Sequence, residues 1–524
     1  MLKRRFAEPV VVAALLALLG GLLVSEAWGD SLTYDEGRYI RSGYCAVQRG
    51  LADVEPANPL GFKLLGGLGL ALFHPGRDDS CAGRDYRHLF DVPPAGLRRM
   101  VFAARLPAVA LTLLGVLLAF AWARSMLGRA PALLTLSLLA TEPNLLGHGH
   151  LVTGDVPLAV GALGCLAAHW RWSETRRHRW LFVSGVAVGF ALLSKASALY
   201  LLPILGAIGL VQWRLGRSRA VQVLSVPAFI AGVAWLTMCA AYLPFRDPLA
   251  PPGVAAMATW LAPPSFIHGL RFQFTHVAAG ATYNYLNGEV RVGRGFWSYF
   301  LEALLLKSTL GMLALSVFAL VVTARSRLTA GWLYLWLPAL VVLAAATLGG
   351  IDIGVRYLMP LYPLLAVAAG IPLASAAVPR RRRTALAVST LVVLAATSSL
   401  LHTPGHIGYF NELAGSRPER YLADSNLDWG QDAWRLRDRV GAGSPLRALY
   451  FGALPLASYG IEGAPLTVRD SPSAGPVAAS LTELTSYGPE ASGYFAALRA
   501  CAGRVTRVGT SILLVPAGPP GPCP

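Results

Sequence analysis

The chain has 524 residues, of which 55% are hydrophobic and only 14% are charged. This composition leaves too little polar surface for a soluble globule of this size and indicates a polytopic membrane protein. The formal net charge is +17, but the basic residues collect in short loops where anionic lipid headgroups lie. No basic stripe is interleaved with exposed aromatic residues, which argues against nucleic acid as a partner and leaves membrane lipids as the expected surroundings.

About eleven apolar runs approach the 17 to 25 residues that a membrane-spanning helix needs. They predict an all-α membrane domain over residues 1–401, with spans at 9–27, 100–123, 131–147, 156–170, 180–194, 196–213, 221–243, 299–323, 332–348, 357–377 and 385–401. The first run is either a span or a signal peptide, because a basic start, an apolar run and a small-residue stop all occur. Removing it would leave the other spans unchanged.

The basic residues predict how the spans are oriented. They precede the first span and follow every even-numbered span, for example Arg124 and Arg129 after the second and 380–383 after the tenth. Because lysine and arginine collect on the cytoplasmic side, we expect a multi-pass protein of the bacterial inner membrane with a cytoplasmic N-terminus. The external loops are then 29–99, 141–155, 244–298 and 349–356.

Residues 402–524 follow the last span and are richer in Gly, Pro and Ser. They predict a small external domain of mixed α/β structure. Cys45 and Cys81 lie in the first external loop, and Cys501 and Cys523 lie in the tail. An oxidising exterior would allow a disulfide within each pair.

The first external loop opens with two adjacent carboxylates, Asp35 and Glu36. One is placed to act as a base while the other orients an acceptor or a metal, or the pair is simply solvated surface. Further along the loop, Asn58 precedes Lys63 in an apolar run that ends at Phe73, about the length of an interfacial helix. Lys63 either meets an anion there or snorkels to the headgroups.

A third group of polar residues precedes the fourth span: His148, His150 and Asp155. Asp155 either caps the helix that Pro157 helps to start or presents a carboxylate rigidly at the membrane surface. His148 and His150 either join it as metal ligands or are plain loop residues. A divalent cation is therefore an open question.

Only four of the 45 basic residues are lysines, and three of these, Lys63, Lys195 and Lys307, lie inside or beside apolar segments. An ammonium in such a place usually meets an anion. With Arg356, which opens the tenth span, they predict a cationic cradle for a phosphate. For each residue alone, a structural partner such as a backbone carbonyl is the alternative.

Carboxylates and phosphate-binding cations on one membrane face fit a particular substrate, a sugar on a polyprenyl phosphate. Its tail lies in lipid, its phosphate at the interface and its sugar in water. Departure of the phosphate needs charge neutralisation, and the acceptor hydroxyl needs a general base. No Gly-Lys dipeptide occurs in the chain, so a P-loop is excluded.

The same segments resemble successive signatures of the lipid-carrier-dependent GT-C glycosyltransferases, which include the protein O-mannosyltransferases, the lipid A aminoarabinose transferases and related bacterial enzymes. The resemblance runs colinearly over nearly the whole chain, at 34–37, 58–65, 148–157, 193–203, 295–310 and 354–363. In the tail, 409–415 and 424–432 are similar to the C-terminal signature of a bacterial branch. We expect the second of these runs to build turns and to pack the tail on the membrane domain, with contact to the acceptor as the alternative.

The resemblance implies an inverting transfer in which Asp35 deprotonates the acceptor and Glu36 positions it. Asp155 would help to hold the acceptor, a metal or the sugar. The donor-phosphate candidates are Lys63, Lys195, Lys307 and Arg356. Asn58 stands where many relatives carry a histidine, which puts a metal requirement in doubt.

Two questions stay open at the level of sequence. A lipid-linked-saccharide transporter or flippase is the alternative function, but it would need polar residues near the bilayer midplane, and these are scarce here. The acceptor is a protein, a lipid or a glycan, because all three present the same hydroxyl chemistry.

Overall fold

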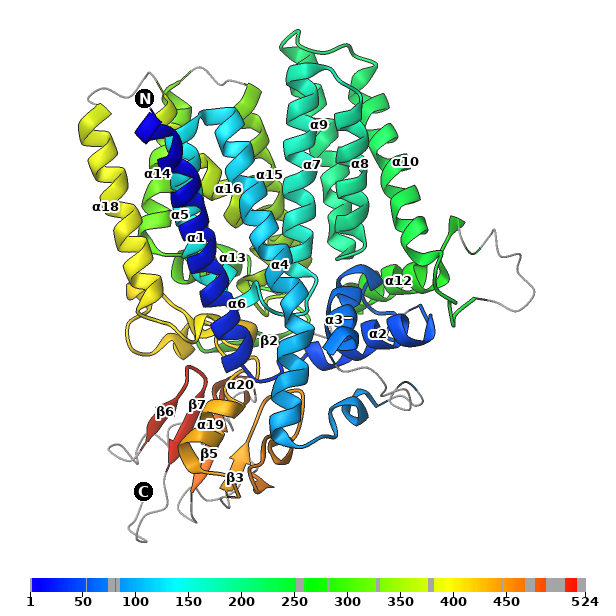
Figure 1. The fold of residues 1–524 in the computed structure, drawn as a ribbon, viewed down its shortest axis with the longest axis vertical. Coiled ribbons are helices and arrows are strands. Elements are labelled where there is room, and N and C mark those ends of the chain that lie inside the picture. Colours follow the sequence, from blue (N-terminus) through cyan, green and yellow to red (C-terminus); the bar gives the residue numbers. More distant parts are fainter. Residues whose placement is uncertain are drawn as a thin grey trace.

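A computed structural model describes residues 2–52, 54–73, 81, 85–250, 259, 261–279, 283–326, 330–375, 381–443, 446–466, 476–486 and 505–515. The molecule is a bundle of long helices with a small mixed sheet at one end (Figure 1). Helix α1 (Leu2–Gly29) begins at the end of the bundle away from the sheet. The sheet and the first interhelical loop therefore lie at the same end.

Among the described residues, six helices are long and apolar enough to cross a membrane. They are α1, α4 (Pro94–Leu127), α9 (Leu201–Arg214) with the 3-10 turn before it, α10 (Gln222–Tyr242), α15 (Ala330–Gly349) and α18 (Arg381–Leu400). The pair α13 (Tyr299–Lys307) and α14 (Leu310–Arg325), bent by 116°, makes a seventh if it is one span. The other bundle helices are α5 (Arg129–Ala140), α6 (Pro143–His148), α7 (Asp155–Thr175), α8 (Arg179–Leu192), α16 (Leu361–Ala368) and α17 (Ile371–Ala374).

Each predicted span contains a helix, but two of them are broken. The run 131–147 stops at the end of α5 and restarts at α6, because Pro143 lacks a backbone N–H and the Glu142 side chain caps the Leu145 N–H at 2.6 Å. The run 299–323 breaks after Lys307, and Thr309 caps the new helix at the Met312 N–H. Hydropathy averaged over a whole span hides these breaks, although polar residues, Glu142 in one run and Lys307 in the other, mark them in the sequence.

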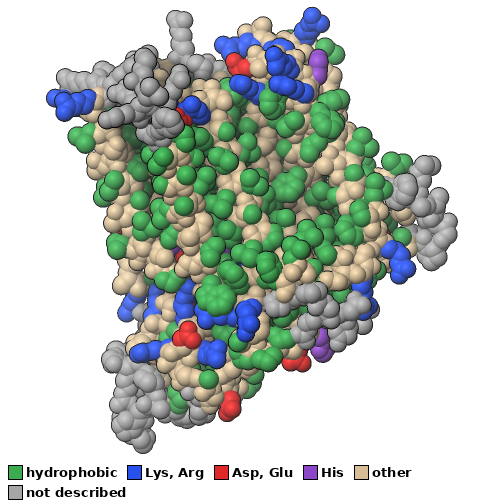
Figure 2. Space-filling view, viewed as in Figure 1, with side chains coloured by type: hydrophobic (Ala, Val, Ile, Leu, Met, Phe, Trp, Pro, Cys, Tyr) green, Lys and Arg blue, Asp and Glu red, His purple; other side chains and the backbone are tan. Residues whose placement is uncertain are grey.

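The surface of the bundle matches a membrane environment. Figure 2 shows a broad band of hydrophobic side chains across the helices, with Lys and Arg side chains gathered above and below it. Large apolar residues such as Leu72, Leu224 and Leu340 are more than half exposed on this surface. The chain is therefore a multi-pass integral membrane protein, as predicted.

Three shorter helices lie across the lower ends of the bundle: α2 (Glu36–Arg49), α3 (Leu60–Phe73) and α12 (Pro264–Ala279) (Figure 1). Helices α2 and α3 cross very closely, because a Cβ on Gly43 would lie 1.8 Å from the Lys63 carbonyl oxygen. A Cβ on Gly67 would lie 2.1 Å from the Gly43 carbonyl carbon. Only glycine fits at either position, so the pair fixes how the two helices pack.

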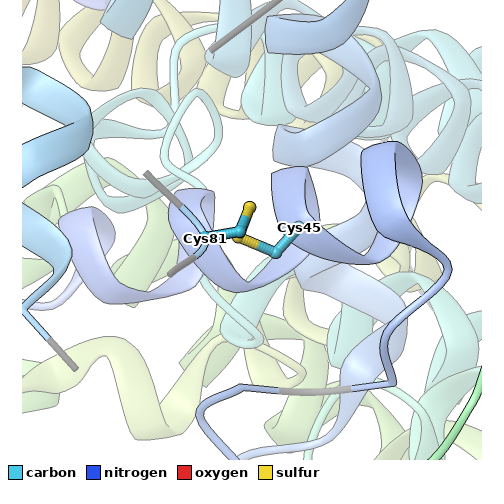
Figure 3. Close-up of a disulfide and its surroundings, with 2 residues drawn as sticks. All are labelled: Cys45 and Cys81. Carbon is cyan, nitrogen blue, oxygen red and sulfur yellow. A yellow bond between two sulfur atoms is a disulfide. The ribbon is translucent and has the colours of Figure 1, made fainter. Parts of the chain in front are cut away.

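A disulfide joins Cys45 on α2 to Cys81, with 5.6 Å between the two Cα atoms (Figure 3). It is the first of the two bridges that the sequence allows. Cys501 and Cys523 lie outside the described residues. The bridge ties the later part of the first external loop back onto α2.

The tail contains a five-stranded mixed sheet in the order β4-β3-β5-β7-β6. Its elements are α19 (Ala433–Val440), β3 (Leu446–Leu449), β4 (Gly463–Pro465), β5 (Val477–Ser480), α20 (Leu481–Ser486), β6 (Thr506–Val508) and β7 (Ile512–Val515). Strand β3 is parallel to β4 and β5, whereas β7 is antiparallel to β5 and β6. The predicted mixed character of the tail is confirmed.

A separate hairpin, β1 (Tyr283–Leu286) and β2 (Glu289–Val292), lies between α12 and α13 in the chain.

Candidate active site

A cavity of about 1130 Å³ lies where the bundle meets the tail. Its wall comes from the first loop, α12, the β1–β2 hairpin, the segment 351–357 and the tail, and it includes Asp35, Lys195, Arg356, Asp424, Trp429 and Phe451. Segments far apart in sequence therefore converge on one space. The size suits a lipid headgroup with a sugar.

Arg356 joins two acidic residues at this cavity. It lies in the 3-10 turn η4 (Val355–Leu358), and its Nη2 is 3.7 Å from Asp35 Oδ2 while its Nη1 is 3.7 Å from Asp155 Oδ2. The guanidinium also stacks over the Trp429 ring at 4.2 Å from the centroid. Its Nε is buried with no hydrogen-bond partner in the described part of the chain. A planar cation fixed by two carboxylates and a ring is well suited to recognise a phosphate.

Asp155 is the first residue of α7, and its side chain does not cap the helix. Instead, Asp155 Oδ1 accepts from Lys195 Nζ at 2.6 Å. The Lys195 ammonium is partly exposed at the cavity and lies 4.0 Å from the centroid of the Tyr357 ring. Asp155 therefore holds both Lys195 and Arg356 in place.

Asp35 occupies the N-cap position of α2 but makes no capping hydrogen bond. Its carboxylate lines the cavity and accepts from Arg38 Nη2 at 2.9 Å. The side chain is 17% exposed. Asp35 is thus an accessible carboxylate beside the guanidinium of Arg356.

Glu36 points away from the cavity into the protein core. Its Oε2 lies 2.6 Å from Arg105 Nη2, and its oxygens accept from the backbone N–H groups of Thr33 and Val152 at 3.0 Å each. Burial opposes ionisation, but Arg105 outweighs it and holds the pKa of Glu36 below its usual range. The acidic doublet therefore splits, with one carboxylate in the cavity and one in the core. Sequence reasoning missed Arg105, although a lone arginine inside a predicted span was the available signal.

Lys63 and Lys307 do not line the cavity. Lys63 Nζ lies 2.9 Å from Glu55 Oε2 and donates to the Asn58 carbonyl at 2.6 Å. Lys307 Nζ, at the break between α13 and α14, donates to the carbonyls of Ile407, at 2.8 Å, and Asn426. The expected cradle of four cations therefore reduces to Lys195 and Arg356 at the cavity. The other two lysines meet the structural partners that were the alternative.

The histidines are buried beside the site rather than in it. His150 Nε2 lies 3.3 Å from Asp30 Oδ2, and the His148 ring packs edge-on against Trp429. Asn58 does line the cavity, and its Nδ2 donates to the Tyr39 hydroxyl at 3.1 Å.

A divalent cation finds no suitable ligand set in the described part of the chain. No group of three or more His, Cys, Asp or Glu residues there has an arrangement that would hold a metal ion. Asp35 and Asp155 converge on a guanidinium instead, so Arg356 already supplies the positive charge between them.

The tail run 424–432 does more than pack the tail. Asn426 Oδ1 accepts from the Val355 N–H at 2.8 Å, and Ser425 Oγ donates to the Ile353 carbonyl at 2.5 Å. These bonds fasten the run to the segment that carries Arg356. Asp424 and Trp429 also line the cavity, a position that suits the alternative of acceptor contact.

Comparison with known proteins agrees with this architecture. Residues 98–243 match the family described as dolichyl-phosphate-mannose-protein mannosyltransferase. The structure is similar to that of ArnT from Cupriavidus metallidurans in the apo state, with a TM-score of 0.54 and 15% identity over 99% of this chain and 100% of that chain. The fold is therefore the one that ArnT has, and residues 98–243 carry the match to the mannosyltransferase family.

Two further solved structures have a similar fold. ArnT from Cupriavidus metallidurans bound to undecaprenyl phosphate gives a TM-score of 0.52 at 15% identity, over 98% of both chains. The S. cerevisiae protein O-mannosyltransferase Pmt1-Pmt2 complex bound to the sugar donor gives 0.52 at 12% identity, over 76% of this chain and 90% of that chain. The chain spans only 53% of the Archaeoglobus fulgidus oligosaccharyltransferase, with a TM-score of 0.47 at 13% identity. Curated protein sequences give no match.

Proposed function

We propose that the chain is a glycosyltransferase of the GT-C class, which moves a sugar from a polyprenyl phosphate to a hydroxyl acceptor at the external face of the bacterial inner membrane. The observation that carries the proposal is the convergence of the Asp35 carboxylate with the cations Lys195 and Arg356 on one cavity. A base and an anion-binding pair are the two requirements of transfer from a phosphate. The N-terminus is cytoplasmic in this proposal, because the arginine-rich loops lie on its side of the membrane.

A lipid phosphate is the donor that suits this position. The cavity lies at the end of an apolar bundle, so a polyprenyl tail can remain in the bilayer while its phosphate meets Lys195 and Arg356. Lysine offers a compact charge and arginine a planar fork. The solved structures of the same fold with undecaprenyl phosphate and with a sugar donor support this choice.

The reaction is a single displacement at the anomeric carbon. The acceptor oxygen attacks C1 from the face opposite the phosphate, and its proton passes to Asp35. The bond between C1 and the phosphate oxygen breaks, and its electron pair leaves with the polyprenyl phosphate. Lys195 and Arg356 stabilise the charge on this leaving group. The configuration at C1 inverts, because one bond forms on the side opposite the bond that breaks.

The other predicted site residues hold the cavity and its charged groups in position in this proposal. Asp155 is a positioning residue that orients Lys195 and Arg356. Glu36, Lys63 and Lys307 fix the first loop and the tail through buried contacts. No step in this scheme passes through a metal ion.

The test replaces Asp35 in the full-length protein. We expect Asp35→Asn to abolish transfer from undecaprenyl-phosphate sugars in proteoliposomes, since an amide cannot accept the acceptor proton. In a strain that lacks this chain, mass spectrometry of envelope lipids, glycans and proteins should show one glycoform missing. Wild-type protein should restore that glycoform and Asp35→Asn should not.

Asp85→Asn is the matched control. Asp85 lies in the same external loop and pairs with Arg87 at 2.8 Å, but it does not line the cavity. This variant should transfer like the wild type. Unchanged turnover by Asp35→Asn would remove Asp35 as the base.

A further inference from the structure

The cavity wall also carries acidic groups that the proposed transfer does not use. Besides Lys195 and Arg356, the wall includes Asp352 from the loop before η4 and Asp424 from the tail. Neither carboxylate makes an ion pair within 4.0 Å in the described part of the chain. The wall therefore carries these two carboxylates in addition to the cations that face the leaving phosphate.

Asp352 lines the cavity and has one carboxylate oxygen that accepts no hydrogen bond from the described residues. The residue is only 2% exposed, and its Oδ2 accepts from the Phe296 N–H. Its Oδ1 is buried and has no hydrogen-bond partner among the described residues. The loop is rigid at this point, because the Asp352 N–H donates to Asn284 Oδ1 on β1 at 2.8 Å. A buried carboxylate oxygen without a donor, at the wall of a cavity, indicates a donor on the ligand.

Asp424 is held in an unusual backbone conformation beside the same space. Its φ is +53°, in the left-handed region that residues other than glycine seldom adopt. The conformation is fixed by the Asp424 N–H, which donates to Thr482 Oγ1 at 3.1 Å, and by the neighbouring contact of Ser425 with Ile353. Such conformations persist where the surroundings over-determine them, often at ligand sites.

Aromatic rings complete this part of the wall. Phe451 from the tail stacks on Tyr34 from the first loop, with centroids 4.8 Å apart and planes 8° from parallel. Both line the cavity, as does Tyr283, whose side chain is largely exposed on the hairpin. Apolar ring faces beside hydrogen-bond acceptors match a sugar ring, whose C–H face is apolar and whose hydroxyls donate.

We propose that Asp352 and Asp424 bind the acceptor, and that this acceptor is a hydroxyl-rich saccharide without negative charge. The proposal rests on the proposed function and adds the class of the second substrate. Both carboxylates accept hydrogen bonds from saccharide hydroxyls, while Asp35 takes the proton of the reacting hydroxyl. An acceptor bearing a phosphate near this wall is disfavoured by like-charge repulsion.

Direct binding tests this independently of turnover. Full-length protein in nanodiscs is titrated with fluorescent mannotriose, with the same trisaccharide carrying a terminal phosphate, and with a serine- and threonine-rich peptide. Mannotriose should bind, and the phosphorylated trisaccharide should bind more weakly by on the order of 10-fold. Tighter binding of the phosphorylated trisaccharide or of the peptide would overturn the proposal.

Two variants link the binding to the named residues. Asp352→Asn and Asp424→Asn should weaken mannotriose binding by about 10-fold, since each replaces a charged acceptor by a neutral one. Asparagine tolerates the left-handed backbone at 424, so that variant keeps the local fold. Asp352→Asn should bind undecaprenyl phosphate like the wild type. Wild-type mannotriose affinity in both variants would contradict the assignment.

The matched control is Glu289→Gln, on the β1–β2 hairpin that contributes to the cavity wall; Glu289 is exposed and paired with Arg291 outside the cavity. It should bind all probes like the wild type. If undecaprenyl phosphate fails to bind the wild type, the donor assignment fails. The saccharide titration without lipid still decides the acceptor class in that case.

Discussion

Arg356 is shared by two carboxylates from different helices, with Nη2 3.7 Å from Asp35 and Nη1 3.7 Å from Asp155. The guanidinium therefore links the proposed base to the residue that orients Lys195. The Arg356 guanidinium thus fixes the distance between Asp35, on the proposed acceptor side of the cavity, and Asp155, on the proposed phosphate side. Substitution of Arg356 should therefore disturb the site through the shape of the new side chain as well as through its charge.

The first prediction concerns the two-pronged guanidinium of Arg356, whose Nη1 and Nη2 lie near different carboxylates. Arg356→Lys keeps one positive charge but cannot contact both carboxylates, so we expect binding of undecaprenyl phosphate to weaken by roughly 10- to 100-fold. Isothermal titration in nanodiscs measures this directly. Arg87→Lys, at an exposed pair away from the cavity, is the control and should bind normally. Equal affinity in the Arg356 variant would mean that the fork does not contact the phosphate.

The second prediction separates the two members of the acidic doublet. Glu36→Gln leaves the buried Arg105 without its counter-charge, and breaking a buried pair in this way costs about 3–5 kcal/mol. We expect a large drop in unfolding temperature. Glu36→Gln combined with Arg105→Met should recover much of that loss, because no uncompensated charge remains. A double variant no more stable than the singles would show that the pair is not the source of the cost.

The third prediction contrasts two lysines. Lys307→Met leaves the Ile407 and Asn426 carbonyls without their donor, which costs about 1–3 kcal/mol per group, and should release the tail. Limited proteolysis of the tail and thermal unfolding measure this. Lys195→Met should weaken binding of undecaprenyl phosphate while the tail stays protected. A selective effect of Lys307→Met on lipid binding would instead return Lys307 to the phosphate site.

The fourth prediction is a pH dependence of stability. Burial raises the pKa of Asp424 from 3.8 to about 6, against the opposing effect of Arg356, and nearby Asp35 adds to the rise. The folded protein then binds more protons than the unfolded chain between about pH 4 and pH 6. The free energy of unfolding should therefore fall as the pH rises through this window.

Asp424→Asn removes that titration. At pH 7 the variant should be more stable than the wild type, by at most about 3 kcal/mol, and the two should converge near pH 4. Thermal unfolding at several pH values checks this. A variant that is less stable at pH 7 would show that the charged form of Asp424 stabilises the fold.

Much of this arrangement could be predicted from local sequence patterns. Hydropathy located the helices, since each span must bury its own backbone polar groups. The tail strands and the Cys45–Cys81 pair followed from composition and from loop position. Asp35, Lys195 and Arg356 were singled out as charges beside apolar runs, and the structure places all three at the cavity.

What the sequence could not show was which partner each charge would find. Glu36 and Asp35 are adjacent, yet helix geometry sends one side chain to Arg105 and the other to the cavity. Lys307 resembles Lys195 in its apolar context, but the break after α13 places it under the tail. Asp424 looked like a turn residue, and its place in the cavity depends on how the tail docks on 353–356.

The tail also sets the order in which the cavity is completed. The ribosome makes Asp35 early, but Phe451 and Thr482, which close the wall, emerge only near the end of synthesis. A chain cut short after α18 would keep its helices and its proposed base, yet it would lack part of the enclosure. The wall of the cavity is therefore complete only after the tail has docked on the segment that carries Arg356.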